Sequence, residues 1–195
     1  MVLPRARFPF RDSRGFTLIE LMVTLSVLAI VLSLAAPSFA SLLASNRMST
    51  QTNEFMVALN LARSEAVRRS QPVTLLSSNA DNYSKGWTVF PDLNGDGAAT
   101  SATDAADGLP IRQSSAFGGT VAVKRQTCTG SPCTYSDSTD ADRMYVVFTG
   151  RGAISATVPA YFKVCDPGNT SVKGRLVQVG VVGKISLLST SVTCP

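Results

Sequence analysis

The chain has 195 residues, a formal net charge of +5 and no histidine. Without histidine no Ser–His or Cys–His nucleophile pair can form, and no glycine-rich phosphate loop is visible, so the composition argues against an enzyme and predicts no cofactor. Four arginines and one aspartate ahead of Gly15 account for +3 of the charge, so the sequence pI of 9.3 is no evidence for nucleic-acid binding.

A short basic stretch ends at Gly15, and Phe16 then opens a long apolar run. The run contains one carboxylate, Glu20, and Pro37 closes it. No charged residue occurs in Leu21–Ala36, and about 20 apolar residues cross a bilayer, so the segment predicts a membrane-spanning helix. Basic residues ahead of the span favour a cytoplasmic N-terminus and an exported remainder. A carboxylate inside an apolar helix is costly, which indicates that Glu20 has a function.

An ordinary secretory signal peptide is the alternative, with cleavage after the small-x-small sequence Ser38-Phe39-Ala40. Against it, Glu20 would interrupt the hydrophobic region and the basic part would be long. The two interpretations predict different mature termini, Phe16 or Ser41.

This N-terminal block resembles that of a type IV prepilin, with a basic leader, a glycine at the cleavage point, a phenylalanine after it and a glutamate four residues later. The resemblance implies that residues 1–15 are a leader, that a prepilin peptidase cuts between Gly15 and Phe16, and that Phe16 becomes N-methylated. It also makes Glu20 the assembly residue. Pro37 lacks an amide donor and its ring crowds the preceding turn, so we expect a kink or local melting near Ser33–Pro37.

From Arg47 to Ser70 the pattern becomes amphipathic, with apolar and small residues recurring at spacings of three and four. These residues are Met48, Thr52, Phe55, Leu59, Ala62 and Ala66. Gln71-Pro72 ends the pattern. The sequence therefore predicts one helix of about 55 residues. Residues 16–46 would be its transmembrane and assembly half, and residues 47–71 would pack on a globular head.

Residues 72–195 form the predicted head, which would be periplasmic and rich in β-structure. Short segments of β-branched and aromatic residues, bounded by Gly, Pro, Asn or Asp, indicate its strands. They are Val73–Ser77, Gly86–Phe90, Leu109–Gln113, Thr120–Gln126, Met144–Thr149, Ala160–Cys165, Arg175–Val182 and Lys184–Leu188. Asp92–Asp107 and Thr127–Asp142 are predicted to be long loops. The predicted fold class is α+β, a long N-terminal helix packed on an antiparallel β-sheet head.

All four cysteines, Cys128, Cys133, Cys165 and Cys194, lie in the exported part. An even number of cysteines in an oxidising compartment predicts two disulfides. Three pairings are possible. Proximity favours Cys128 with Cys133, which would leave Cys165 and Cys194 to hold the C-terminal tail. A zinc site is the alternative, but the chain has no Cys-x-x-Cys and no histidine.

Asp92-Leu93-Asn94-Gly95-Asp96-Gly97 matches the first half of a calcium loop, in which Asp92, Asn94 and Asp96 would be alternating oxygen ligands. The complete motif needs a glutamate at its twelfth position, where this chain has Thr103. The same residues suit an Asn-Gly turn between strands. We favour the turn and predict no metal.

Four elements resemble the GspH/FimT family of minor pilins and pseudopilins. They are Arg63-Ser64-Glu65-Ala66, Gly86-Trp87-Thr88-Val89-Phe90, Phe148-Thr149-Gly150-Arg151-Gly152, and a late Gly-Arg-strand-Gly-basic hairpin. The resemblance implies a subunit of low abundance, anchored in the bacterial inner membrane and then placed at or near the tip of a pilus or secretion pseudopilus. Its partners would be a prepilin peptidase and other pilins or pseudopilins.

FimT-like members linked to DNA uptake carry Gly-Arg-x-Arg in this hairpin, where the chain has Gly183-Lys184-Ile185-Ser186. The departure favours a FimU-like pilus subunit that helps to initiate assembly over a DNA receptor, with a type II secretion pseudopilin as the other alternative. Residual DNA binding would involve Lys184 and Arg175, in a patch with Lys163 and Lys173. Few phosphate-neutralising charges are available, so a solvated surface is the favoured interpretation of these residues.

Overall fold

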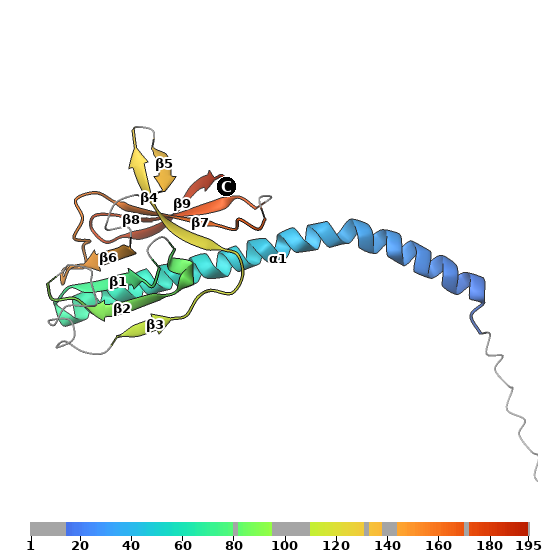
Figure 1. The fold of residues 1–195 in the computed structure, drawn as a ribbon, viewed down its shortest axis with the longest axis horizontal. Coiled ribbons are helices and arrows are strands. Elements are labelled where there is room, and N and C mark those ends of the chain that lie inside the picture. Colours follow the sequence, from blue (N-terminus) through green and yellow to red (C-terminus); the bar gives the residue numbers. More distant parts are fainter. Residues whose placement is uncertain are drawn as a thin grey trace, which may run out of the picture. The chain divides into compact units, whose positions relative to one another are not determined.

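The computed structural model describes residues 15–79, 82–94, 110–130, 133–137, 144–169 and 172–194. The chain divides into two compact units, Met1–Ala40 and Ser41–Pro195. The first unit contains the apolar half of the long helix, and the second contains the remainder of that helix and both β-sheets (Figure 1).

Helix α1 (Leu18–Arg69) has 52 residues, close to the predicted length. It ends because Ser70 adopts a positive φ of 53° and Gln71 N donates to Ala66 O, a C-terminal capping arrangement, after which Pro72 prevents continuation. The helix is unbroken through Pro37, so α1 does not melt at Ser33–Pro37 in this isolated subunit. The alternative expectation, a kink at the same place, stays a prediction. A single missing amide donor does not unwind a helix whose neighbouring turns stay bonded.

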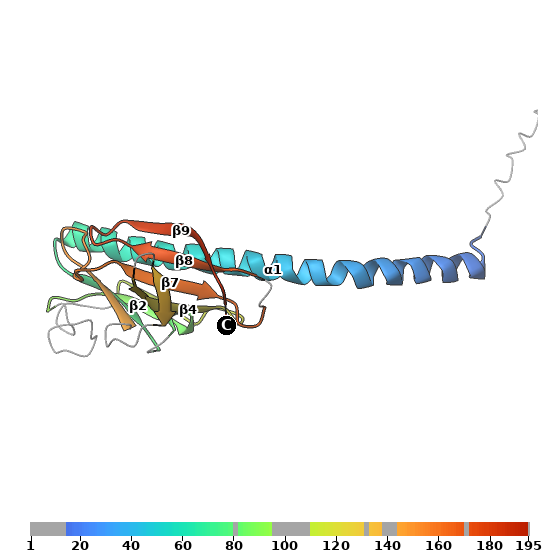
Figure 2. The same ribbon diagram turned by 90° about the horizontal axis from the view of Figure 1, so that it is seen from above.

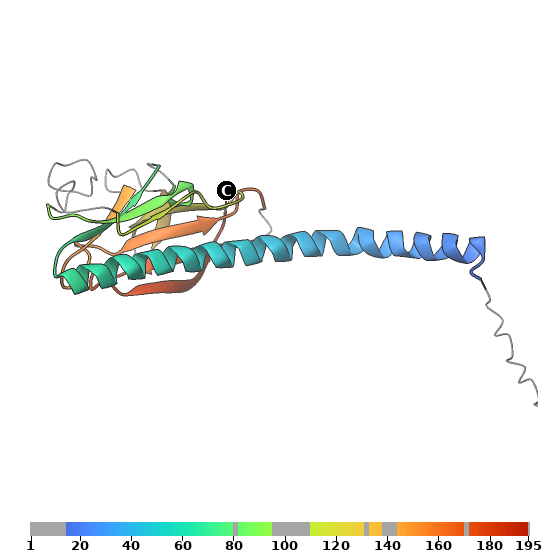
Figure 3. The ribbon, with the colours of Figure 1, turned by 90° about the horizontal axis from the view of Figure 1, so that it is seen from below.

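Two antiparallel sheets follow α1, in the strand orders β3-β2-β1-β6 and β5-β4-β7-β8-β9. The elements are β1 (Val73–Ser77), the 3₁₀ helix η1 (Tyr83–Lys85), β2 (Trp87–Pro91), β3 (Arg112–Ser114), β4 (Ala122–Thr129), β5 (Thr134–Asp137), β6 (Tyr145–Phe148), β7 (Ala160–Cys165), β8 (Gly174–Val179) and β9 (Ile185–Val192). The predicted α+β class is confirmed. Figure 2 shows β7, β8 and β9 side by side along the head half of α1 (Ser41–Arg69), and Figure 3 shows α1 from the opposite side.

The predicted helix face is buried throughout, with each of its six residues no more than 1% exposed. Phe55, on this face, meets Tyr83 and Phe162 edge-on, at ring-centroid distances of 5.3 and 5.0 Å. The three rings join α1, η1 and β7 in one core. Such aromatic pairs stabilise beyond the area they bury, by about 0.5–1.5 kcal/mol each.

Three predictions about the head are wrong in detail. The predicted loop Thr127–Asp142 contains the end of β4 and the whole of β5, which pair as a hairpin. The polar sequence of β5, Thr-Tyr-Ser-Asp, lacks the apolar alternation that marks a strand, because cross-strand pairing rather than burial holds it. β3 begins three residues later than expected, and β9 extends to Val192. Of the predicted loop Asp92–Asp107, only 92–94 are among the described residues.

Candidate functional site

The apolar half of α1 is bare in the isolated chain. All described side chains from Phe16 to Ala40 are exposed, including Phe16 at 81% and Leu34 at 73%. By length and composition this helix can cross a membrane. Such a surface is stable only against lipid or other apolar helices.

The few hydroxyls in this segment bond to the helix that carries them. Thr24 Oγ1 donates to Leu21 O at 2.9 Å, Ser26 Oγ to Met22 O at 2.8 Å, and Ser33 Oγ to Ile30 O at 2.7 Å. A hydroxyl bonded in this way avoids most of the cost of entering an apolar medium.

Glu20 lies in the first turn of α1, where the structure gives it a local partner. Thr17 occupies the N-cap position, and its Oγ1 accepts a hydrogen bond from Glu20 N at 3.3 Å. Threonine followed three residues later by glutamate is the capping-box pattern, and a carboxylate is favourable at the positive end of a helix dipole. The sequence signal Thr-x-x-Glu could have revealed this role. The part of Glu20 in assembly stays a prediction.

Gly15 and Phe16, the residues on either side of the predicted cleavage point, are exposed. A Cβ built on Gly15 would meet nothing within 4 Å. Cleavage of the bond between these two exposed residues stays a prediction.

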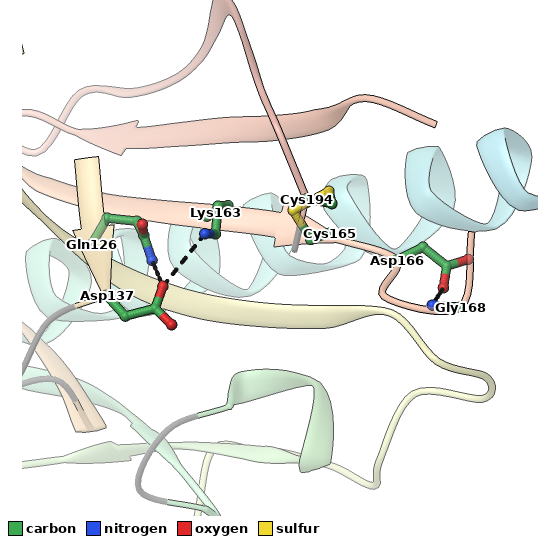
Figure 4. The surroundings of a disulfide bond; sticks show 7 residues. All are labelled: Gln126, Asp137, Lys163, Cys165, Asp166, Gly168 and Cys194. Atoms are coloured by element: carbon green, nitrogen blue, oxygen red, sulfur yellow. Dashed lines mark hydrogen bonds and ion pairs between the residues drawn. A yellow bond between two sulfur atoms is a disulfide. The ribbon is translucent and has the colours of Figure 1, made fainter. Parts of the chain in front are cut away.

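Cys128 pairs with Cys133 across the β4–β5 hairpin. Cys165 pairs with Cys194, which joins the end of β7 to the tail after β9 (Figure 4). Their Cα–Cα distances, 5.3 and 5.5 Å, are ordinary for disulfides. Gly174 lies against the second bond, because a Cβ there would come within 2.7 Å of Cys165 Sγ. The two bonds use every cysteine in the sequence, which leaves none as a zinc ligand.

A basic patch was the less favoured interpretation of Lys163, Lys173, Arg175 and Lys184, and the structure gives three of these residues separate surroundings. Lys163 and Lys124 both pair with Asp137, at 3.5 and 3.4 Å, and Gln126 Nε2 donates to the same carboxylate (Figure 4 shows the Gln126 and Lys163 contacts). Partial burial alone would raise the pKa of Asp137, but the Gln126 hydrogen bond and the two lysine charges outweigh it and lower that pKa.

Arg175 is also occupied, since its guanidinium donates to Ser49 Oγ at 2.7 Å and ties β8 to α1. Lys184 is exposed beyond the other end of β8, where its carbonyl accepts from Gly180 N. At about 3.3 Å per residue, the strand separates the two residues by about 16 Å. The structure therefore does not bring Arg175 and Lys184 together.

Asp92, the first residue of the candidate calcium loop, is fully buried and accepts a hydrogen bond from Thr74 Oγ1. Its own amide donates to Pro72 O at 3.0 Å. Both contacts hold Asp92 against the start of β1. Asn94 is exposed, and Asp96 lies outside the described residues. Among the described residues no cluster of three or more metal-ligating side chains occurs.

Sequence reasoning missed the role of Arg63. Its Nε donates to Gly152 O at 3.0 Å and a terminal nitrogen donates to Val182 O at 3.4 Å. Gly183 has a φ of +77°, and a Cβ there would fall 1.8 Å from Gly152 O. We call Arg63, Gly152, Val182 and Gly183 the Arg63 bracket, because they join α1, the turn after β6 and the β8–β9 turn. The bracket unites three motifs that carry the resemblance.

Comparison with known proteins identifies the family. A family model described as type II transport protein GspH matches residues 51–183, more than half of the chain. The chain belongs to the GspH family. A second model, the prokaryotic N-terminal methylation motif, matches residues 10–36, which include Gly15, Phe16 and Glu20. The pilin-like family that the sequence resembles is thus confirmed. A search of curated proteins found no match.

Solved structures share the fold. The type IV minor pilin FimU of Pseudomonas aeruginosa superposes with a TM-score of 0.58 at 21% identity, covering 77% of this chain and 96% of FimU. A second crystal form of FimU superposes with a TM-score of 0.54 at 21% identity, covering 75% of this chain and 99% of that one. The minor pseudopilin EpsH of Vibrio cholerae gives 0.49 at 13% identity over 78% and 98% of the two chains, which is too loose to carry an argument. GspH-family members are structural pilins and pseudopilins, and a bare apolar N-terminal helix fits membrane anchoring followed by incorporation into a fibre.

Proposed function

We propose that the chain is a minor pilin, made as an inner-membrane precursor with its head in the periplasm and then placed at or near the tip of a type IV pilus, where it helps to start assembly. The observation that carries the proposal is the fully exposed apolar half of α1 with one carboxylate, Glu20, in its first turn. Lipid covers this surface before assembly, and the helices of other pilins cover it afterwards. Its partners are then a prepilin peptidase, other minor and major pilins, and the membrane.

Cleavage between Gly15 and Phe16 creates a new amino group four residues from Glu20. In apolar surroundings an isolated charge is very costly, whereas a paired one is tolerable. The proposal therefore gives Glu20 the task of pairing with the Phe16 amine of its own or an adjacent subunit. The match to the N-terminal methylation motif over residues 10–36 supports this assignment.

Two substitutions separate the charge of Glu20 from its role at the helix N-terminus. Glu20→Gln keeps the Glu20 N–Thr17 bond and the side-chain length but loses the charge, so it should insert in the membrane, be cleaved, and fail to enter fibres. Thr17→Val keeps the charge and removes the cap, so it should still assemble. Quantitative immunoblotting of sheared fibres and of inner membranes measures both. Normal incorporation of Glu20→Gln would falsify the assignment.

A type II secretion pseudopilin is the second candidate, and the GspH family match favours it. The pilus is our proposal because the hairpin Gly183-Lys184-Ile185-Ser186 favours a FimU-like subunit, and the fold shared with FimU is consistent with it. Deletion of the gene in its own host distinguishes the two. Loss of surface pili with normal secretion supports the pilus, and the reverse result supports the pseudopilin.

A further inference from the structure

A groove runs along one flank of the head half of α1. It consists of two adjoining cavities of ≈480 and ≈390 Å³ that share Thr50, Glu54 and Ser114. One wall is α1 from Leu43 to Val57, about 21 Å at 1.5 Å per residue. The other wall is β3 together with Ser115–Gly118. We call it the flank groove.

Two polar groups in the walls of the flank groove lack partners. Gln51 is 6% exposed, and its Nε2 donates to Gly118 O at 2.8 Å, but no described residue donates to its Oε1. Trp87 is 3% exposed, and no described residue accepts from its Nε1. An unsatisfied buried polar group typically costs about 1–3 kcal/mol, and native structures rarely retain one without a reason. An acceptor is thus missing at one place in the groove and a donor at another.

The charge of the flank groove and the position of β3 in its sheet indicate what kind of ligand the groove could bind. β3 is the edge strand of its sheet, so one side of its backbone has no strand neighbour among the described residues (Figure 1). Arg47 and Arg112 line the groove against one acid, Glu54, which leaves it with a net positive charge. The Arg112 guanidinium lies over the Trp87 ring, 5.9 Å from its centre, and because Trp87 Nε1 is buried, a ligand reaches it only when neighbouring side chains shift.

We infer that the flank groove binds an extended segment of a neighbouring pilin-family subunit, about six residues long at 3.3 Å per residue and carrying at least one carboxylate. Its backbone adds to the free edge of β3 and supplies both kinds of hydrogen-bonding group, and its carboxylate meets Arg112. A helix would bring only side chains, because its own backbone groups are already paired. This inference rests on the proposed function, since it requires a neighbouring subunit.

Site-specific photocrosslinking in the full chain, expressed in its own cells, tests the inference. A photoreactive phenylalanine at Asn53 samples the groove, the same residue at exposed Thr157 is the head control, and Leu25 samples the apolar half of α1. We expect Asn53 to capture a pilin-family subunit through a non-helical segment of its head, located by mass spectrometry, and Thr157 to capture none.

The outcomes separate the inference from the proposed function. Crosslinks from Leu25 but none from Asn53, or crosslinks from Asn53 to a neighbour's N-terminal helix, overturn the groove while the minor-pilin function stands. The absence of crosslinks from both Leu25 and Asn53 overturns the proposed function and, with it, the inference about the flank groove. Arg112→Glu should reduce the Asn53 crosslink about five-fold or more, whereas Arg112→Lys should keep it. Unchanged urea midpoints and unchanged Leu25 crosslinks show that the variants fold, and an undiminished Asn53 crosslink in Arg112→Glu overturns the assigned charge contact.

Discussion

Replacing Gly183 with alanine should be among the most damaging single-atom additions to the head. Gly183 has a φ of +77°, which costs an L-residue about 1–2 kcal/mol. The added Cβ would also lie 1.8 Å from Gly152 O, so the β8–β9 turn must move away from the turn after β6. That movement disrupts the contacts of Arg63, whose part-buried bond to Gly152 O contributes about 1–1.5 kcal/mol and whose longer, exposed bond to Val182 O contributes less. We expect a total loss of about 2–4 kcal/mol in the free energy of unfolding.

Gly118→Ala is the matched control, because a Cβ there meets nothing within 4 Å and its φ lies outside the left-handed region. It should change stability by less than about 1 kcal/mol. Urea denaturation of the full chain in detergent, followed by the emission of Trp87, the only tryptophan, measures both variants. Arg63→Ala combined with Gly183→Ala should cost less than the sum of the two, since both remove the same bonds. Equal midpoints for Gly183→Ala and Gly118→Ala would refute the reasoning.

Replacing the Cys165–Cys194 pair with two alanines should cost about 3–4 kcal/mol in urea denaturation, because the bond closes a loop with a sequence separation of 29; an unchanged midpoint contradicts this. Glu65→Gln should cost a few tenths of a kcal/mol at pH 7. Hydrogen bonds from Arg68 and Arg69 lower the pKa of Glu65, so this contribution to stability is present above the unfolded pKa and disappears as pH falls through the folded pKa. A gap from wild type that persists once Glu65 is protonated in the folded chain argues against it. The chain should bind duplex DNA weakly at physiological salt in a gel shift, and Lys184→Arg with Ser186→Arg should strengthen binding; tight binding by the native chain counts against the structural role.

Hydrophobic patterns in the sequence predicted the helix and strands that are stabilised by burying an apolar face. The helix face from Met48 to Ala66 follows a period near 3.6, and β1, β2 and β7 are rich in buried β-branched and aromatic residues, so both appear in the sequence. β5 and η1 escaped prediction because pairing and packing hold them, not composition. Tyr83 illustrates this, since its burial between Phe55 and Phe162 depends on residues far away in the chain.

The functional features divide in the same way. Gly15, Phe16 and Glu20 could be singled out because the N-terminal methylation motif, which matches residues 10–36, is a linear segment of chain. The contacts of Arg63 and Arg175 were not, because each reaches a partner more than 80 residues away. The sequence indicated only that Arg175 is a basic residue on a strand. The structure adds that its guanidinium donates a hydrogen bond to Ser49 Oγ of α1.

Under the proposed function, cleavage after Gly15 changes the charge at the start of α1, and this change explains the position of Glu20. While the leader is attached, residue 16 has an amide nitrogen, and Glu20 simply favours the positive end of α1 beside the Thr17 cap. Cleavage places a positive amine at that same end, where the helix dipole repels it and lipid cannot hydrate it. A carboxylate one turn away offsets both the repulsion by the helix dipole and the loss of hydration. The amine and the carboxylate then form a pair with no net charge, which can leave the membrane surface. Alanine at position 20 would disturb the helix start and the charge together, whereas glutamine disturbs only the charge. Glu20→Gln is therefore the substitution that tests the assembly role of Glu20.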